Sequence, residues 1–212
     1  MKTPFTTEQF FNVFEKYNST MFPLQLIIIL LGIVGLFLLK SKYSFKNKLI
    51  GGYLGVLWLW MGLAYHIGFF AEINKAAFVF GGFFILQGLL ILYNTFVKGQ
   101  LIFDFVPKAK DYIGYFFIIF GLILYPIIGY FMVDSLTKTI SLGLPCPTTI
   151  LTFGFLMLTN NKFPKYLLII PSLWALIGLS AAINFGVYQD FMILITAIIA
   201  DIVLVKRKAL KN

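Results

Sequence analysis

The sequence has little charge and almost no cysteine or histidine. Only 12% of its 212 residues are charged, against about 25% in a typical soluble domain. The chain is 60% hydrophobic, and its mean hydropathy is +0.92. So few charged side chains cannot cover a water-soluble globule, and so apolar a chain is not intrinsically disordered. Because Cys146 is the only cysteine, an internal disulfide scaffold is excluded. We therefore predict an all-α polytopic membrane protein.

Motifs of known chemistry are also absent. The sequence contains no P-loop, HExxH, CxxC or GxSxG pattern. One histidine and one cysteine cannot complete a zinc site without carboxylates such as Glu72, so we predict no metal site and no cofactor. The last apolar segment, 187–205, has no lysine, which excludes a retinal Schiff base there.

Apolar segments of suitable length recur along the chain. A membrane-spanning helix needs about 20 mostly apolar residues, and seven segments meet this requirement approximately. They leave no room for a soluble domain, and their short connections predict mostly antiparallel neighbours in a helix bundle over residues 23–206. The predicted spans are 23–39, 49–70, 76–97, 112–133, 140–158, 166–183 and 187–205.

The net charge of +9 is unevenly distributed over the predicted loops. Thirteen of the seventeen basic residues follow the first, third, fifth and seventh spans, including the tail at 207–212. The positive-inside rule then predicts an N-terminus outside and a basic cytoplasmic tail. We interpret the charge as a topology signal, so the predicted partner is the lipid bilayer and not nucleic acid.

Residues 1–22 are predicted to contain an amphipathic helix on the outer surface. Thr6 and Gln9 form a capping-box pattern, and Phe5 can pack against Phe10 as a hydrophobic staple. This helix can serve as a surface anchor or as a lid over an outer pocket.

Polar residues inside a membrane are costly, so each needs a reason. His66 is predicted in the outer third of the second span, next to Tyr65, and Asn74 and Glu72 follow at its outer end. One interpretation is that His66 bonds a carbonyl of a neighbouring helix. The other is that it binds a ligand or carries a proton, because histidine titrates near neutrality.

The segment 143–149, GLPCPTT, is the most unusual stretch of the chain. Its two prolines predict a break, with a regular helix starting within two residues of Pro147 and an irregular, protein-buried segment at 140–146. Cys146 would lie at a depth similar to His66. The free N–H groups of Thr148 and Thr149 would then point outward, although Cys146 can equally be a small apolar filler.

Two further polar residues lie within predicted spans. Gln87 is predicted to bond a backbone carbonyl freed by Pro126 or Pro171. Asp201 lies near the inner interface, where a basic side chain can neutralise it, or where it can serve as a coupling carboxylate. The turn before the last span is polar and could rim an outer pocket, with Asn184, Gln189 and Asp190.

Motifs spread over nearly the whole chain are similar to those of a known family. They include Trp58-Leu59-Trp60, Tyr65-His66, Tyr125-Pro126 and, most specifically, the GLPCPTT segment. Together they resemble a bacterial family of small multi-span membrane proteins classed as a domain of unknown function. The resemblance implies a bacterial cytoplasmic membrane and implies no activity.

Three functions are compatible with these features. The first is a small-solute transporter or binding protein, whose small-molecule or ion ligand enters an outer-facing pocket at the broken fifth helix. The second is a non-catalytic assembly partner or sensor. The third is a membrane enzyme with Cys146 as nucleophile and His66 as base, which requires the sulfur and the imidazole within hydrogen-bond reach. The predicted pocket residues are Tyr65, His66, Asn74, Cys146, Thr148 and Thr149.

Overall fold

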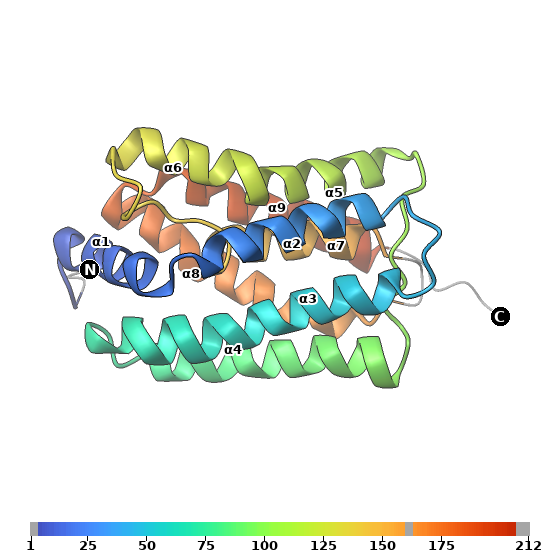
Figure 1. The fold of residues 1–212 in the computed structure, drawn as a ribbon, viewed down its shortest axis with the longest axis horizontal. Coiled ribbons are helices and arrows are strands. Elements are labelled where there is room, and N and C mark those ends of the chain that lie inside the picture. Colours follow the sequence, from blue (N-terminus) through green and yellow to red (C-terminus); the bar gives the residue numbers. More distant parts are fainter. Residues whose placement is uncertain (1–3, 160–162, 207–212) are drawn as a thin grey trace.

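The computed structural model describes residues 4–159 and 163–206, and over these residues the chain is all-α, as predicted. The long helices run side by side along the longest axis of the molecule (Figure 1). The first half contains α1 (Thr7–Met21), α2 (Leu24–Leu38), α3 (Lys46–Trp60), η1 (Met61–Phe69), η2 (Phe70–Glu72), α4 (Ala77–Leu92) and η3 (Tyr93–Val97). The second half contains α5 (Ala109–Ile119), η4 (Phe120–Leu124), α6 (Tyr125–Val133), α7 (Pro145–Met157), η5 (Lys165–Leu168), α8 (Ile169–Phe185), η6 (Tyr188–Asp190) and α9 (Phe191–Val205).

Five helical stretches of the described residues are long and apolar enough to cross a membrane, or six if the bent pair α1 and α2 counts as one span. All seven predicted segments coincide with helices. Two of them are shorter than a spanning helix: α2 has 15 residues and follows a bend of 84°, and α7 has 13. The five long stretches are Lys46–Glu72, Ala77–Val97, Ala109–Val133, Lys165–Phe185 and Tyr188–Val205.

The outward faces of these helices are apolar. Leu30, Val56, Leu89 and Phe131 are among many large hydrophobic side chains that are more than half exposed. Monomeric soluble proteins rarely expose so extended an apolar surface. These exposed apolar faces, like the long apolar helices, are compatible with a membrane protein.

Helix α7 lies at the centre of the bundle, as expected of a broken interior helix. Every residue of α7 except Cys146 is buried. The helix starts at Pro145, two residues before Pro147, so the irregular segment covers 140–144 and not 140–146. Both prolines fit because N–H groups in the first helical turn have no acceptor within the helix. The backbone N–H of Thr148 donates to the Leu144 carbonyl at 3.3 Å, so it is not free to face outward as predicted.

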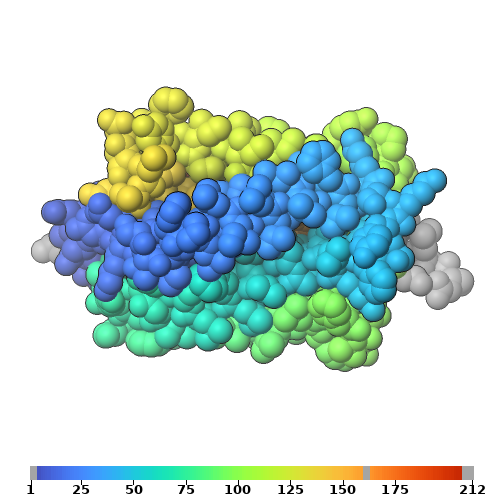
Figure 2. All heavy atoms as spheres, in the orientation of Figure 1, coloured from blue at the N-terminus to red at the C-terminus, as the bar shows by residue number. Residues whose placement is uncertain are grey.

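Helix α1 crosses one end of the bundle and turns into α2, which continues along the surface (Figure 2). The predicted capping box between Thr6 and Gln9 is present, and the rings of Phe5 and Phe10 stack at 5.9 Å. The Tyr17 hydroxyl accepts from Trp60 Nε1 at 2.7 Å and donates to the Gly143 carbonyl at 3.2 Å. These bonds tie α1 to both α3 and the linker before α7.

Two further contacts hold the flanks of α1. Lys16 pairs with Glu72 at 2.6 Å, beside η2. On the other flank, Asn18 Nδ2 donates to the Thr137 carbonyl at 2.7 Å. The first helix therefore bridges the two sides of this end of the molecule.

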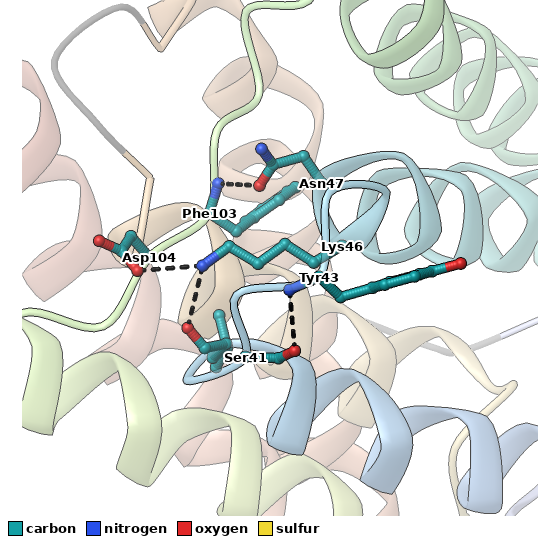
Figure 3. Close-up of polar contacts among 7 residues, drawn as sticks. Ser41, Tyr43, Lys46, Asn47, Phe103 and Asp104 are labelled. Carbon is teal, nitrogen blue, oxygen red and sulfur yellow. Dashed lines mark hydrogen bonds and ion pairs between the residues drawn. The ribbon is translucent and has the colours of Figure 1, made fainter.

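At the opposite end of the bundle, the start of α3 contacts the connection between η3 and α5. Lys46 Nζ pairs with Asp104 Oδ1 at 3.1 Å, and Asn47 Oδ1 accepts from the backbone N–H of Phe103 at 2.8 Å (Figure 3). The N–H of Asp104 donates to the Leu158 carbonyl at 2.9 Å. The connection between η3 and α5 is thus held against both α3 and the end of α7.

Candidate binding pocket

A cavity of about 230 Å³ lies at the end of the bundle that α1 crosses. Five parts of the chain line it: the α1 region, residues between Tyr65 in η1 and Phe80 in α4, the start of α7 with Ile140 before it, α8 from Trp174 to Phe185, and Asp190. The cavity therefore forms where the short helix α7 begins before it reaches the ends of its neighbours. A helix extending to the end of the bundle would fill this space.

Aromatic rings form the outer wall of the cavity. Phe185, at the end of α8, stacks on Phe5 at 5.2 Å and on Phe10 at 4.5 Å between ring centroids. Tyr65 stacks on Phe14 at 5.9 Å and on Phe70 at 5.7 Å. Because Phe5, Phe10 and Phe14 belong to the N-terminal region, that region covers the cavity, which favours the lid interpretation of residues 1–22.

A buried carboxyl group lies deep in the cavity. Asp190 is 1% exposed, and its Oδ1 accepts a short hydrogen bond from the Tyr125 hydroxyl. The thiol of Cys146 lies beside this carboxyl group. Among the lining residues that the structure describes, Asp190 is the only acidic or basic one.

Local backbone geometry places these groups. Helix α8 ends at Gly186, whose φ of 73° lies in the left-handed region that favours glycine. The chain then turns into η6, and the N–H of Asp190 donates to the Val187 carbonyl at 2.9 Å. On the facing side, a Cβ at Gly178 would lie 3.5 Å from Cys146 Sγ, so the missing side chain leaves space beside the thiol.

The predicted pocket residues separate into two groups. Tyr65, Asn74 and Cys146 line the cavity, whereas the structure places Thr148 and Thr149 outside its lining, fully buried. Thr148 Oγ1 accepts from the N–H of Gly143 at 3.1 Å, and Thr149 Oγ1 donates to the Pro145 carbonyl at 2.7 Å. The two threonines therefore stabilise the turn and the first helical turn of α7.

His66 is fully buried among aromatic rings. Its ring lies 4.5 Å from Phe84 and 5.1 Å from Trp174 between centroids. Both ring nitrogens lack a hydrogen-bond partner, so the predicted bond to a neighbouring carbonyl is not formed. For the same reason no hydrogen bond joins His66 to Cys146. The geometry that the enzyme hypothesis requires is therefore missing from this state.

Gln87 takes the structural role predicted for it. Its Nε2 donates to the Leu167 carbonyl at 2.9 Å. Leu167 lies four residues before Pro171, whose missing N–H leaves that carbonyl without its helical partner.

Asp201 and Glu72 have partners of different kinds. Asp201 Oδ2 accepts from the Ser172 hydroxyl at 2.7 Å, and none of the ion pairs among the described residues involves Asp201. The predicted neutralisation of Asp201 by a basic side chain is therefore not seen among the described residues, and Asp201 instead bonds Ser172 of α8. Glu72 pairs with Lys16, and both side chains are about half exposed.

Sequence reasoning missed parts of this site. Asp190 was expected at the rim and lies inside, and Asn184 lines the cavity as expected. Trp174 also lines the cavity, with an indole nitrogen that has no hydrogen-bond partner, and nothing in the sequence distinguishes it from an ordinary apolar residue of a span. The sequence distinguishes Tyr125 in one respect, because it precedes a proline within a predicted span.

Over residues 4–159 and 163–206, no group of three or more His, Cys, Asp or Glu side chains could hold a metal ion.

Comparison with protein families matches residues 7–212 to the family of unknown function DUF6064. Because the match covers almost the whole chain, the chain belongs to this family, and the predicted membership of a family of unknown function is confirmed. No curated protein and no solved structure gives a significant match.

Proposed function

We propose that this member of the DUF6064 family is a multi-pass protein of the bacterial cytoplasmic membrane that binds a small solute from the outer side. In this proposal it acts as a transporter or as a binding protein. The apolar outer faces of its helices support the membrane environment. The basic residues that follow α2, η3 and α7 support a cytoplasmic location for that end.

The observation that carries the proposal is the asymmetry between the two ends of the bundle. The end with few basic residues has a cavity that reaches a buried carboxyl group. At the other end, the pairs Lys46–Asp104 and Asn47–Phe103 hold the start of α3 against the connection between η3 and α5 (Figure 3). A pocket accessible from one side is what a binding protein presents, and also what a transporter presents in one of its states.

The sole cysteine offers a direct test, because Cys146 lines the cavity. In intact cells, a membrane-impermeant maleimide should label Cys146 from outside without permeabilisation. Gly178→Leu should slow this labelling strongly, since its side chain would occupy the space beside the sulfur. Gly82→Leu is the matched control, because a Cβ at Gly82 meets nothing within 4 Å. Labelling from the cytoplasmic side alone, or none with any reagent, would overturn the proposal.

A sensor is the second candidate, and the contacts of α1 favour it. This helix covers the cavity with Phe10 and Phe14, and it is joined to opposite flanks of the bundle through Lys16 and Asn18. A solute that fills the cavity would therefore change the position of α1. Uptake of a bound solute into proteoliposomes distinguishes the transporter, whereas a sensor would bind the solute without accumulating it.

A further inference from the structure

We propose that the cavity takes a small organic cation, an amine or a quaternary ammonium ion, with Asp190 as its counter-ion and the surrounding aromatic rings as its cage. The inference rests on the proposed function, since it requires that the cavity be reachable from outside. It names the class of ligand for that same site.

The first argument is charge. Asp190 is buried, and none of the ion pairs of the described residues involves it. The Tyr125 hydroxyl, which donates to Asp190, and the adjacent Cys146 thiol are both neutral groups, so neither neutralises a carboxylate. A buried charge is costly unless it is paired. The rest of the lining has no basic residue, so in the empty cavity the carboxyl group avoids this cost only by being protonated. A cation that enters the cavity supplies the charge that pairs with the ionised carboxylate.

The second argument is the chemistry of the walls. Cations bind favourably over the faces of aromatic rings, most strongly over Trp and when both groups are desolvated. Trp174, Tyr65 and Phe70 line the cavity together with Phe80, Phe185 and the three phenylalanines of the N-terminal region. One carboxylate within aromatic walls provides both the electrostatic and the cation–π contribution. Neutral solutes of the same shape would obtain only the apolar contacts.

The third argument concerns divalent metal ions. A dehydrated Mg²⁺ or Ca²⁺ needs six or more oxygen ligands. The polar side chains of the lining are the carboxylate of Asp190, the amides of Asn74 and Asn184, and the hydroxyl groups of Tyr65 and Ser180. The cavity of about 230 Å³ is smaller than the roughly 300–1,000 Å³ of pockets for drug-sized ligands. Both features favour a compact cation with an apolar surface.

Two measurements on Cys146 in the full-length protein test this inference. The first compares its rates of modification by a cationic trimethylammonioethyl methanethiosulfonate and by the anionic sulfonatoethyl reagent. We expect the cationic-to-anionic rate ratio to exceed that for free cysteine by at least about tenfold, because a cleft of one charge sign concentrates the opposite charge. Asp190→Asn should bring the ratio close to that of free cysteine. Asp201→Asn, which removes a carboxylate farther along the same helical stretch, Tyr188–Val205, should leave it high.

The second measurement requires no variant and so does not depend on Asp190→Asn folding. Choline should slow modification of Cys146 by neutral N-ethylmaleimide, and its uncharged isostere 3,3-dimethylbutan-1-ol should do so at least about tenfold less effectively at equal concentration. The cation proposal would be overturned if both molecules protected equally, or if neither protected and the two methanethiosulfonates showed no charge preference. Either result would leave the outer pocket standing. Complete inertness of Cys146 toward every reagent would overturn the pocket and the cation proposal together.

Discussion

At the scale of single residues, the buried polar groups of the bundle repair local defects of the helices. Gln87 bonds the carbonyl of Leu167 that Pro171 leaves without a partner, and Thr148 accepts from the N–H of Gly143 in the turn before α7. In a membrane no water can replace such bonds, so each defect requires a side chain from elsewhere in the fold.

The pairing of Gln87 with the carbonyl freed by Pro171 predicts a measurable coupling. Gln87→Met keeps the side-chain volume and removes the donor, and we expect it to destabilise the protein by about 1 kcal/mol. In a Pro171→Ala background, alanine supplies the missing helical N–H, so the same substitution should cost clearly less. The measurement is the thermal unfolding in detergent of the wild type, the two single variants and the double variant, which together form a double-mutant cycle. Additive effects of the two substitutions would show that the Leu167 carbonyl does not need Gln87.

At the scale of the elements, close backbone contact determines how the long helices pair. A Cβ at Gly81 on α4 would lie 2.9 Å from the carbonyl oxygen of Gly62 on η1, closer than real Cβ atoms approach backbone. The contact joins the π-helical end of the second predicted span to α4. It therefore positions Tyr65, on that same π-helical segment, against the cavity.

Neighbouring glycines on α4 provide a matched test of this contact. Gly81→Ala should separate α4 from η1 and destabilise the protein by about 1–3 kcal/mol through overpacking. Gly82→Ala meets nothing within 4 Å, and it should be neutral or stabilise by up to about 1 kcal/mol through helix propensity. Unfolding midpoints of both variants in detergent measure the difference. Similar midpoints would contradict backbone-to-backbone packing between these helices.

At the scale of the whole molecule, the two ends of the bundle differ in charge, and the cavity lies at one of them. The loop between α2 and α3 lies at one end, and the linker after α6 begins at the other (Figure 1). Lys42 is exposed in the first, and Leu136 is 78% exposed in the second. Both positions can carry a reporter cysteine once Cys146 is replaced by serine.

The proposed orientation predicts opposite behaviour of these reporters. In intact cells, an impermeant maleimide should label Leu136→Cys directly and should label Lys42→Cys only after the membrane is permeabilised. Cys146→Ser alone provides the unlabelled control. The reverse pattern would invert the topology and place the cavity on the cytoplasmic side.

The sequence by itself determined the helical class, the approximate ends of the long helices and the interruption before α7. These properties follow from composition, from runs of apolar residues and from the two prolines around Cys146, all of which act locally. The start of α7 was predicted to within two residues of Pro147 because only the first helical turn tolerates proline. The bond of Gln87 was predictable because a proline identifies which carbonyl is left free.

Only the tertiary structure decided which of these polar residues meet. Asp190 accepts from Tyr125, which is 65 positions away in the sequence, and it lies beside Cys146. His66 lies at a similar expected depth to Cys146 but faces Phe84 and Trp174. Apolar periodicity places a residue along its own helix, whereas the rotation of that helix against its neighbours depends on close contacts such as that between Gly62 and Gly81. The carboxyl group, the thiol and the aromatic wall therefore become one cavity only when the helices pack.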